Sequence, residues 1–408
     1  MRYRHGHGDN IGMKRGEKMK KHITQDEVIE LTRELIRTPT INPPGDTRKC
    51  AEIILNKFKK EHIDAEIVEG KKGACNVVAR LPGKGKGKVL LLNGHIDVVP
   101  PGENWTVDPF GAEIRDGKIY GRGTSDMKSG VASLMAAMIG LKRSGASFNG
   151  EIIFTAICDE ETGSEFGTAY LLKKGIGKHA TFAIIAEPTS LRVELGNRGL
   201  RWIDIAVRGK ASHAGRPHLG VNAILYGARI IEAIHSIKFE NRNDAFDVPE
   251  PSLSVTMVHG GTKENIIPDR CDLVLDRRMI PGETAENVVK ELKEAIHPIL
   301  EKEKDLRIEL KLRPNSWDPY LISENEPIVQ AMVESVKEVT GKEPGIGAKA
   351  GCTDGSHLFH LGGIPTALFG PGEASLSHQA DEWVAMENIS ISTEVLISVF
   401  DRLFHPPS

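Results

Sequence analysis

Cysteine and long apolar runs are both scarce in this chain. Its five cysteines are scattered over 408 residues without a CxxC pair, which argues against a disulfide framework or a thiolate zinc site and favours a cytoplasmic location. No apolar run approaches the ~20 residues that a membrane-spanning helix needs. The net charge is only −3, from 53 Lys and Arg against 56 Asp and Glu, so the charge indicates neither a nucleic acid nor a membrane as partner.

The composition is that of a folded chain. Hydrophobic residues make up 39% and charged residues 27%, which is enough apolar material for packed cores. At ~150 residues per domain, the length predicts two domains. Residues 1–22 are polar and basic and lack the apolar segment of a secretory signal, so we expect them to form a disordered leader.

Most of the chain predicts helices that alternate with strands. A capping box of Thr24 and Glu27 begins a helix that extends to residue 36, where apolar residues recur with helical spacing. Further helices are expected at 48–61, 129–141 and 327–340. Strands with continuous apolar runs, typical of a sheet covered on both faces, are expected at 89–93, 151–157, 181–185 and 365–368. This alternation predicts an α/β fold.

The pattern changes between residues 200 and 313. A strand, a helix, two strands, a helix and a strand follow one another there, which is the order of a ferredoxin-like α+β unit. The α/β pattern then returns. We therefore expect a larger domain of residues 23–199 and 314–408, with a small domain of residues 200–313 inserted into it.

Five short segments place imidazole or carboxylate groups at junctions between predicted elements. They carry His95 with Asp97, then Asp126, Glu160 with Glu161, Glu187, and His378. Each segment alone also fits a solvated acidic surface or a helix cap, but ligands in open α/β sheets collect at the carboxyl ends of strands. Carboxylates with imidazole and without thiolate suit zinc, cobalt or manganese, and a carboxylate left over to bridge suits a two-metal hydrolase.

Two other kinds of site are not indicated. The chain has no Gly-x-Ser-x-Gly elbow, and Ser125 and Ser164 lack a base at the right kind of turn for a nucleophilic serine. The Gly-Lys repeat at 83–88 precedes a strand instead of joining a strand to a helix, so it predicts an exposed turn and not a phosphate loop.

In this order, the five segments resemble the metallopeptidase and deacylase family that includes acetylornithine deacetylase, succinyl-diaminopimelate desuccinylase, aminoacylase and a glutamate-releasing carboxypeptidase. The resemblance runs from about residue 24 to the C-terminus, and residues 94–100, 121–128 and the Glu160–Glu161 pair are its most specific parts. It implies a zinc-peptidase-like catalytic domain, with a mixed sheet flanked by helices. It also implies that the inserted ferredoxin-like domain acts as a lid and joins two chains into a homodimer.

The resemblance implies two divalent metal ions, Zn²⁺ in the first place, with Co²⁺ or Mn²⁺ able to substitute. His95 and Glu187 would hold one ion and Glu161 and His378 the other, with Asp126 bridging them. Two ions ~3.5–4 Å apart lower the pKa of a shared water and polarise the scissile carbonyl.

Three further residues would take part in the reaction by the same resemblance. Asp97 would support His95. Glu160 would act as general base, taking a proton from the water between the metals and delivering it to the leaving amine. His213 would stabilise the oxyanion, reaching from the inserted domain into the active site of the partner subunit.

Four residues match substrate-binding positions of the family. Arg278 matches an arginine that holds the substrate's carboxylate, for which a guanidinium suits through two parallel hydrogen bonds, although a surface ion pair is the alternative. Asn265 matches an asparagine that helps to bind substrate. Gly351 and Thr353 match loops that line the acyl pocket.

The function predicted from this resemblance is that of a metal-dependent amidohydrolase in amino-acid biosynthesis. Its substrate would be a small N-acyl amino acid, of the acetylornithine or succinyl-diaminopimelate type. A dipeptidase or a glutamate-releasing carboxypeptidase, acting on short peptides, is the first alternative because these enzymes share the metal residues. A non-catalytic relative is the second, but all five ligand positions and Glu160 are present, which argues against it.

Overall fold

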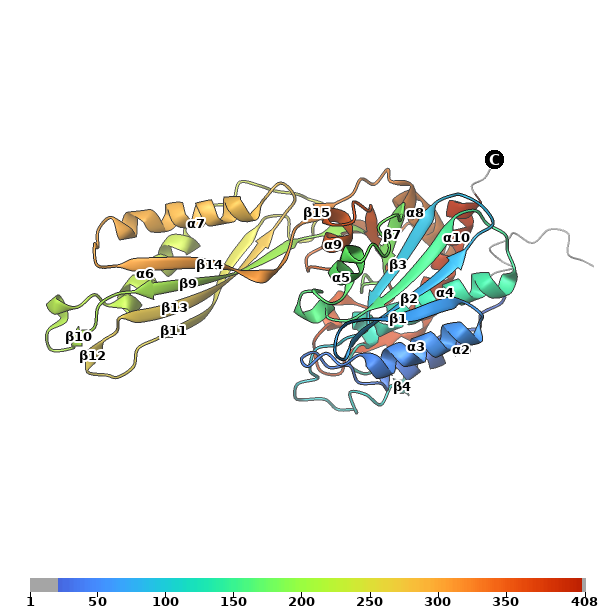
Figure 1. Cartoon of the computed structure of the whole chain (residues 1–408), viewed down its shortest axis with the longest axis horizontal. Helices are drawn as coiled ribbons and strands as arrows, with labels where there is room; N and C mark the ends of the chain where they lie inside the picture. The colour runs from blue at the N-terminus through green and yellow to red at the C-terminus, as the bar shows by residue number, and fades with distance from the viewer. Residues whose placement is uncertain (1–20, 406–408) are drawn as a thin grey trace, which may run out of the picture. The chain divides into compact units, whose positions relative to one another are not determined.

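The computed structural model describes residues 21–405, which divide into two compact units (Figure 1). The first unit comprises the chain up to Val193, Glu324–Gly345 and the chain from Ile364, and the second comprises Glu194–Ser323 and Ile346–Gly363. The predicted leader falls outside the described residues, except for a turn at residues 21–22. The predicted limits of the inserted domain, 200–313, lie inside the second unit and stay a prediction.

A mixed sheet forms the centre of the first unit. Its strands, in spatial order, are β1 (Asp64–Lys71), β2 (Ala74–Pro82), β6 (Glu151–Ile157), β3 (Val89–His95), β7 (Phe182–Ile185) and β17 (Thr366–Leu368). The pairs β1–β2 and β2–β6 are antiparallel, whereas β6, β3, β7 and β17 run parallel. The carboxyl ends of β6, β3 and β7 therefore meet at one edge of the sheet, where ligands bind in such folds.

Helices lie on both sides of this sheet (Figure 1). They are α2 (Gln25–Ile36), α3 (Arg48–Lys60), α4 (Ser129–Ser144), α5 (Thr168–Lys173), α8 (Pro327–Thr340) and α10 (Met386–Phe404). The α4 helix approaches closely because Gly94 of β3 faces Val131, where a Cβ would come within 2.8 Å of a methyl group. The neighbouring Asn93 points to the opposite face, because side chains alternate along a strand, and it donates a hydrogen bond of 3.1 Å to Thr168 of α5. The sequence-based prediction of a mixed sheet flanked by helices is confirmed.

Short elements complete the first unit. A three-stranded sheet consists of β18 (Trp383–Ala385), β5 (Lys118–Tyr120) and β4 (Glu113–Arg115). Three short turns are η1 (Thr124–Lys128), in which Asp126 and Met127 have non-helical backbone angles, η2 (Glu160–Thr162) and η4 (Ala374–Leu376). Two of these turns carry residues of the candidate site.

The second unit is built around a four-stranded antiparallel sheet. Its main elements, in chain order, are β9 (Gly199–Arg208), α6 (Ala223–His235), β11 (Ser252–Gly260), β13 (Arg270–Met279), α7 (Ala285–Leu300) and β14 (Arg307–Trp317). The spatial order β11-β13-β9-β14 is that of a ferredoxin-like fold, as predicted. Both helices pack on the same face, since one buried cluster joins Ile230 of α6 and Leu292 of α7 to Ile205 of β9.

The remaining elements of the second unit are short. They are β8 (Val193–Asn197), β10 (Ser212–His213), η3 (Pro217–Leu219), β12 (Ile266–Ile267), β15 (Tyr320–Leu321), β16 (Ile346–Lys349) and α9 (Gly355–His360). Strand β10 pairs with β12, and β8 pairs with β15 and β16.

Several predicted elements are confirmed, and one predicted strand is longer in the structure because it pairs with a neighbouring strand. The capping box of Thr24 and Glu27 is present, and the bounds of α8 and β6 are those predicted. Strand β3 continues beyond the predicted residue 93 because His95 still pairs with Ile157 of β6. The extra residues carry an imidazole to the end of the strand.

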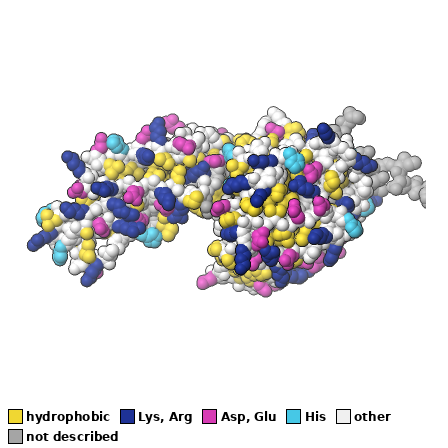
Figure 2. Space-filling view, in the orientation of Figure 1, with side chains coloured by type: hydrophobic (Ala, Val, Ile, Leu, Met, Phe, Trp, Pro, Cys, Tyr) yellow, Lys and Arg dark blue, Asp and Glu magenta, His cyan; other side chains and the backbone are white. Residues whose placement is uncertain are grey.

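The surface agrees with the nearly balanced charge. Lys and Arg side chains are interspersed with Asp and Glu on the face that Figure 2 shows. Within residues 21–405, no helix combines the length and the apolar character needed to cross a membrane.

An ion-pair network ties the N-terminal helices to α4. Arg143 donates two hydrogen bonds to Glu61, at 2.9 and 2.8 Å, and a third to Glu27 at 2.9 Å. These bonds from Arg143 lower the pKa of Glu61 below its ordinary value, against the opposing effect of burial. Burial also opposes the shift at Glu27, but hydrogen bonds from Thr24 and Arg143 outweigh it and lower that pKa too.

Arg143→Met should lower the stability of the chain by about 1 kcal/mol at pH 7, the upper part of the range for partly exposed ion pairs. The two carboxyl groups are more acidic in the folded than in the unfolded chain, so their contribution is present above about pH 4.5 and is lost as the pH falls through the folded pKa. Thermal unfolding at pH 7 and at pH 3.5 should therefore show a difference in Tm from wild type that shrinks in acid. The matched control is Arg48→Met, which removes a single, more exposed pair with Glu69 and should cost less. A difference that is unchanged in acid would contradict the assignment.

Candidate metal centre

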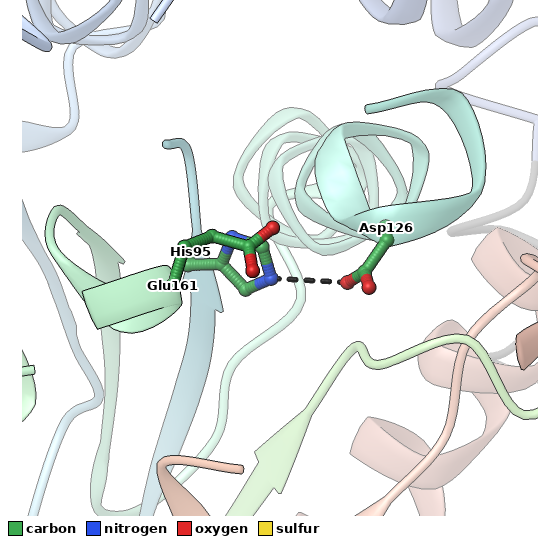
Figure 3. A group of neighbouring side chains, drawn as sticks. All are labelled: His95, Asp126 and Glu161. Carbon is green, nitrogen blue, oxygen red and sulfur yellow. Dashed lines mark hydrogen bonds and ion pairs between the residues drawn. The ribbon is translucent and has the colours of Figure 1, made fainter. Parts of the chain in front are cut away.

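Three ligand-type side chains converge at the carboxyl edge of the parallel strands. His95 ends β3, Asp126 lies in η1 just before α4, and Glu161 lies in η2 after β6 (Figure 3). One nitrogen or oxygen atom of each lies within 4.8 Å of the others. The three residues are far apart in the sequence, and the parallel register of β3 and β6 brings His95 next to the end of the strand that precedes Glu161.

The imidazole of His95 is held on both sides. Its Nδ1 lies 3.0 Å from the backbone oxygen of Asp97, and its Nε2 lies 3.1 Å from Oδ1 of Asp126. With Nδ1 donating to the Asp97 carbonyl, Nε2 is the nitrogen that can bind a metal. Burial opposes protonation, but the hydrogen bond to Asp126 and the charges of Glu160, Asp126 and Asp97 raise the pKa of His95 well above its ordinary value.

His378 contacts the same group of carboxylates from the C-terminal part of the chain. Its Nε2 lies 3.2 Å from Oε2 of Glu161 and 3.6 Å from Oδ2 of Asp126. The hydrogen bond to Glu161 raises the pKa of His378, although burial opposes the shift. Asp126 therefore directs one carboxylate oxygen to each of the two imidazoles.

Asp97 connects His95 to the acidic pair. This buried carboxylate accepts hydrogen bonds from the backbone N–H groups of Glu160 and Glu161, both at 3.2 Å, and from Asn42 at 2.9 Å. Burial raises the pKa of Asp97 to about 6, although the charge of His95 opposes that rise. Asp97 thus holds the backbone of Glu160 and Glu161 as well as the ring of His95. The part played by Asn42 was not predicted, because its position depends on the tertiary structure.

Glu187 follows the strand next to His95. Asn93 of β3 pairs with Ile185 of β7, and both strands run in the same direction. Beyond the end of β7, the N–H of Ala186 still donates a hydrogen bond to the backbone oxygen of Asn93, at 3.1 Å, and Glu187 is the next residue. Glu187 is buried there, as a ligand on the inner side of the site would be.

The donor set fits a pair of divalent ions. Imidazole nitrogens and carboxylate oxygens converge without a thiolate, which suits zinc, cobalt or manganese. The central carboxylate of Asp126 faces both imidazoles through separate oxygens, as a carboxylate that bridges two ions does.

Two predicted residues lie together on a ribbon of the second unit. His213 of β10 pairs with Ile266 of β12, and the backbone oxygen of Asn265 accepts a hydrogen bond from the N–H of Ala214 at 2.9 Å. The exposed ring of His213 accepts a hydrogen bond from the N–H of Gly215 on Nδ1, at 3.0 Å. In a neutral ring the proton is then on Nε2.

The other predicted substrate residues of the second unit also lie close together. Arg278 lies at the end of β13 and directs Nη1 to the sulfur of Cys352, at 3.7 Å. Cys352 stands between Gly351 and Thr353, and the buried hydroxyl of Thr353 donates to the side chain of Asn197 at 2.7 Å. The substrate-binding roles of these residues stay a prediction.

Comparison with protein families decides the relationship. Residues 91–402 match the model of the peptidase family M20/M25/M40. The chain belongs to this family. It is therefore a hydrolase that acts on amide bonds, and the resemblance inferred from its motifs is confirmed.

Individual members agree with this placement in the M20 family. The chain is 29% identical over 392 residues to a succinyl-diaminopimelate desuccinylase of Thioalkalivibrio sulfidiphilus, covering 92% of this chain and 99% of that one. Its fold matches the aminopeptidase PepT of Bacillus cereus with a TM-score of 0.77 and 22% identity, covering 94% and 99% of the two chains. It also matches a Bacillus subtilis protein described as a dinuclear metal-binding peptidase, with a TM-score of 0.71 and 17% identity, covering 92% and 98%.

A buried ion pair between Arg122 and Glu382 lies next to the metal ligands, and the sequence analysis gave it no role. Glu382 is fully buried and accepts hydrogen bonds from Arg122 at 2.6 Å and from the N–H groups of Ser125 at 2.7 Å and Asp126 at 3.0 Å. Arg122 in turn donates to the backbone oxygen of Gln379, next to His378, at 3.1 Å. The pair thus joins the two loops that present Asp126 and His378. The sequence signals were that Arg122 lies in the motif at 121–128 and that Glu382 follows His378 in the same short acidic segment.

Glu382→Gln should reduce the metal affinity of this M20 chain by roughly 10- to 100-fold, the usual effect of losing a residue that orients a ligand. The glutamine side chain has only one oxygen that accepts hydrogen bonds. It therefore cannot serve both Arg122 and the backbone N–H groups of Ser125 and Asp126. It should also destabilise the fold by about 3–5 kcal/mol, because Arg122 loses its buried counter-charge. Elemental analysis after dialysis against a graded chelator measures the first effect and thermal unfolding the second. Asp381→Asn is the matched control, since Asp381 binds Thr106 instead. Wild-type metal retention in Glu382→Gln would refute the positioning role.

Proposed function

We propose that this chain hydrolyses the amide bond of small N-acyl amino acids that carry a free carboxylate. Among these, substrates of the succinyl-diaminopimelate type are the leading choice. The observation that carries the proposal is the convergence of His95, Asp126, Glu161 and His378, with Glu160 beside them. The name of the Thioalkalivibrio relative, which matches over nearly its whole length, supports the choice of acyl group.

The proposed enzyme uses two divalent metal ions. Zn²⁺ is the leading choice, and Co²⁺ or Mn²⁺ would be able to replace it. His95 and Glu187 would hold one and Glu161 and His378 the other, with Asp126 between them. Ions bound there polarise the scissile carbonyl and lower the pKa of the attacking water.

The protein's own groups perform the proton transfers. Glu160 takes a proton from the attacking water on a carboxylate oxygen and delivers it to the nitrogen of the leaving amine. Asp97 fixes the backbone of Glu160, at 3.2 Å, and so aims its side chain. His213, from the partner subunit, donates its Nε2 proton towards the developing oxyanion, and Arg278 holds the carboxylate of the substrate.

A panel of substrates tests the proposal. The Zn²⁺- or Co²⁺-loaded protein should release the amino acid from N-succinyl and N-acetyl substrates, fastest from N-succinyl-diaminopimelate, and should leave dipeptides largely intact. Turnover of dipeptides alone would move the chain to the peptidases of its family. No turnover of any substrate by the fully metal-loaded protein would favour a non-catalytic relative.

The adjacent glutamates give a matched pair of variants for the same assay. Glu160→Gln should lose roughly 10²–10⁴-fold in kcat, the effect of removing a general base, while elemental analysis still finds two metal ions per chain. Glu161→Gln should instead lose one ion. The reverse pattern of metal loss would show that the two roles are assigned wrongly.

We also propose that the chain is a homodimer joined through the second unit. Strand β11 is at the edge of its sheet, where no other strand of residues 21–405 pairs with its outer backbone N–H and C=O groups. Its side chains Met257 and Val258 are 47% and 53% exposed. On the adjacent helix α6, Ile224 and Leu225 are exposed as well, so an apolar surface continues from the strand to the helix. A second copy of β11 would cover this surface and pair with the open edge.

Val258→Lys should convert the dimer into a monomer, because a charge on the edge strand opposes strand pairing. Light scattering after size exclusion should give the mass of one chain for the variant and of two chains for the wild type. Leu361→Lys, which alters an exposed leucine outside this surface, is the control and should stay dimeric. The monomeric variant should also lose turnover but keep its metal, since His213 of the partner would be missing. A monomeric wild type would overturn the proposal.

The location proposed for the enzyme is the cytoplasm. Four of its five cysteines are buried, and all five are thiols without a disulfide. Unpaired thiols are typical of proteins that work in a reducing compartment.

A further inference from the structure

Lys128 is a fully buried lysine to which the site described above gives no role. It ends η1, two residues after Asp126, and its Nζ donates to the backbone oxygens of Leu35 at 3.0 Å and Thr38 at 2.8 Å. Within residues 21–405, no carboxylate lies at ion-pair distance from this ammonium group. Two neutral oxygens only partly replace the water that an ammonium ion loses on burial, so the position is costly unless these contacts serve a purpose.

The loop that presents Asp126 is attached to the protein through Lys128. The backbone N–H of Lys128 donates to the oxygen of Gly123 at 2.9 Å, which closes the loop of residues 123–128. The stem of the lysine lies against Gly123, where an added Cβ would be 3.3 Å from its Cδ. Nζ then joins this closed loop to the end of α2, whose last carbonyl groups favour a positive charge.

A short segment after α2, residues 38–42, runs beside the end of β3, and we call it the strap. Thr40 of the strap donates from Oγ1 to the backbone oxygen of Ile96 at 2.5 Å. The backbone oxygen of Thr40 also accepts from the N–H of Val98 at 3.0 Å. Because Ile96 directly follows His95, the strap holds the backbone that carries this imidazole.

The strap also supports the acidic pair. Asn42, at its end, donates to the carboxylate of Asp97 at 2.9 Å and to the hydroxyl of Thr162 at 3.1 Å. Asp97 in turn accepts from the N–H groups of Glu160 and Glu161. One segment therefore contacts the supports of both the first imidazole and the acidic pair.

The loop of Asp126 thus has two buried charged anchors. Glu382 accepts from N–H groups of this loop and, through its ion pair, joins the loop to the segment of His378. Lys128 joins the same loop to the strap beside His95. Each anchor fixes the loop relative to one of the two imidazoles.

We propose that Lys128 is a positioning residue that fixes Asp126, through the strap, at the distance from His95 at which one carboxylate can serve two metal ions. Asp126 directs one oxygen to each imidazole, so a shift of its loop changes its distance to both ions. That Asp126 binds metal rests on the proposed function, whereas the connection between the loop and the strap does not.

Lys128→Met keeps the stem of the side chain and removes the ammonium group. The metal affinity of this variant should fall by roughly 10- to 100-fold, the usual effect of losing a group that orients a ligand. Elemental analysis after dialysis against a graded chelator measures this loss. The visible absorption of the Co²⁺-loaded variant should also differ from that of the wild type, because the spectrum reports the arrangement of ligands around the ion.

Two comparisons separate positioning from a general loss of structure. The Tm of metal-free Lys128→Met should stay close to that of the wild type, because losing two hydrogen bonds and no longer burying a charge have opposite effects on stability. Lys142→Met is the matched control, since it makes the same change in the last turn of α4 and should keep wild-type metal affinity. Wild-type metal affinity and an unchanged Co²⁺ spectrum in Lys128→Met would overturn the proposal.

Thr40→Val tests the other end of the same connection. Valine keeps the shape of this buried side chain and removes its hydrogen bond to Ile96, so the metal affinity should fall by roughly tenfold. Thr32→Val is the matched control, because Thr32 is equally buried but binds the oxygen of Val28 within α2. Wild-type affinity in Thr40→Val would overturn the proposal even if Lys128→Met does not fold.

The double variant of Lys128→Met and Thr40→Val shows whether the two residues act through one strap. Its metal affinity should be little lower than that of the weaker single variant, because residues in one network are not additive. Losses that multiply would show two independent effects and would contradict the proposal.

Hydrogen exchange of the metal-free protein tests the connection without metal or turnover. The N–H groups of Val98 and Asn42 bond across the strap, and in Lys128→Met they should exchange roughly three- to tenfold faster, the effect of losing about one hydrogen bond. Unchanged exchange would overturn the connection. A wild type that binds two ions without hydrolysing any substrate would contradict only the proposed function. An active wild type whose metal affinity is unaffected by Lys128→Met and Thr40→Val would contradict only the role of Lys128.

Discussion

The buried ion pair of Arg122 and Glu382 is the interaction on which the metal centre depends. Glu382 fixes the backbone of the loop that carries Asp126, and Arg122 fixes the segment that carries His378. Burial raises the pKa of Glu382, although the hydrogen bond from Asp126 and the charge of Arg122 oppose that rise. A pair of this kind adds little net stability, but breaking it is costly, so it keeps two distant loops in one arrangement.

The carboxyl edge of the parallel strands positions the other residues of the site. Strands β3, β6 and β7 run parallel, and His95, the Glu160–Glu161 pair and Glu187 each follow the end of one of them. Asp97 then joins two of these strand ends through hydrogen bonds to the acidic pair. Carboxylates held this rigidly against one another repel, and positive charge at their centre relieves the repulsion, which is the physical basis for a site with two divalent ions.

The second unit supplies chemistry of another kind. Its ferredoxin-like sheet presents an edge strand, β11, with the exposed apolar side chains of Met257 and Val258, while Arg278 lies at the end of β13. The exposed apolar side chains of this unit and its predicted substrate residue therefore belong to different strands of the same sheet.

The sequence by itself determined the α/β class, the ferredoxin-like order of the insert and the residue types of the metal site, because periodicity and short motifs are local properties. It also placed His95, Asp126 and Glu161 as candidate ligands, and the structure brings these three together. Only the tertiary structure decided that β3 extends to His95 and that Asn42 and Glu382 hold the ligand-bearing loops. These features depend on strand register and on burial between segments distant in the chain, and no local pattern of side chains encodes either.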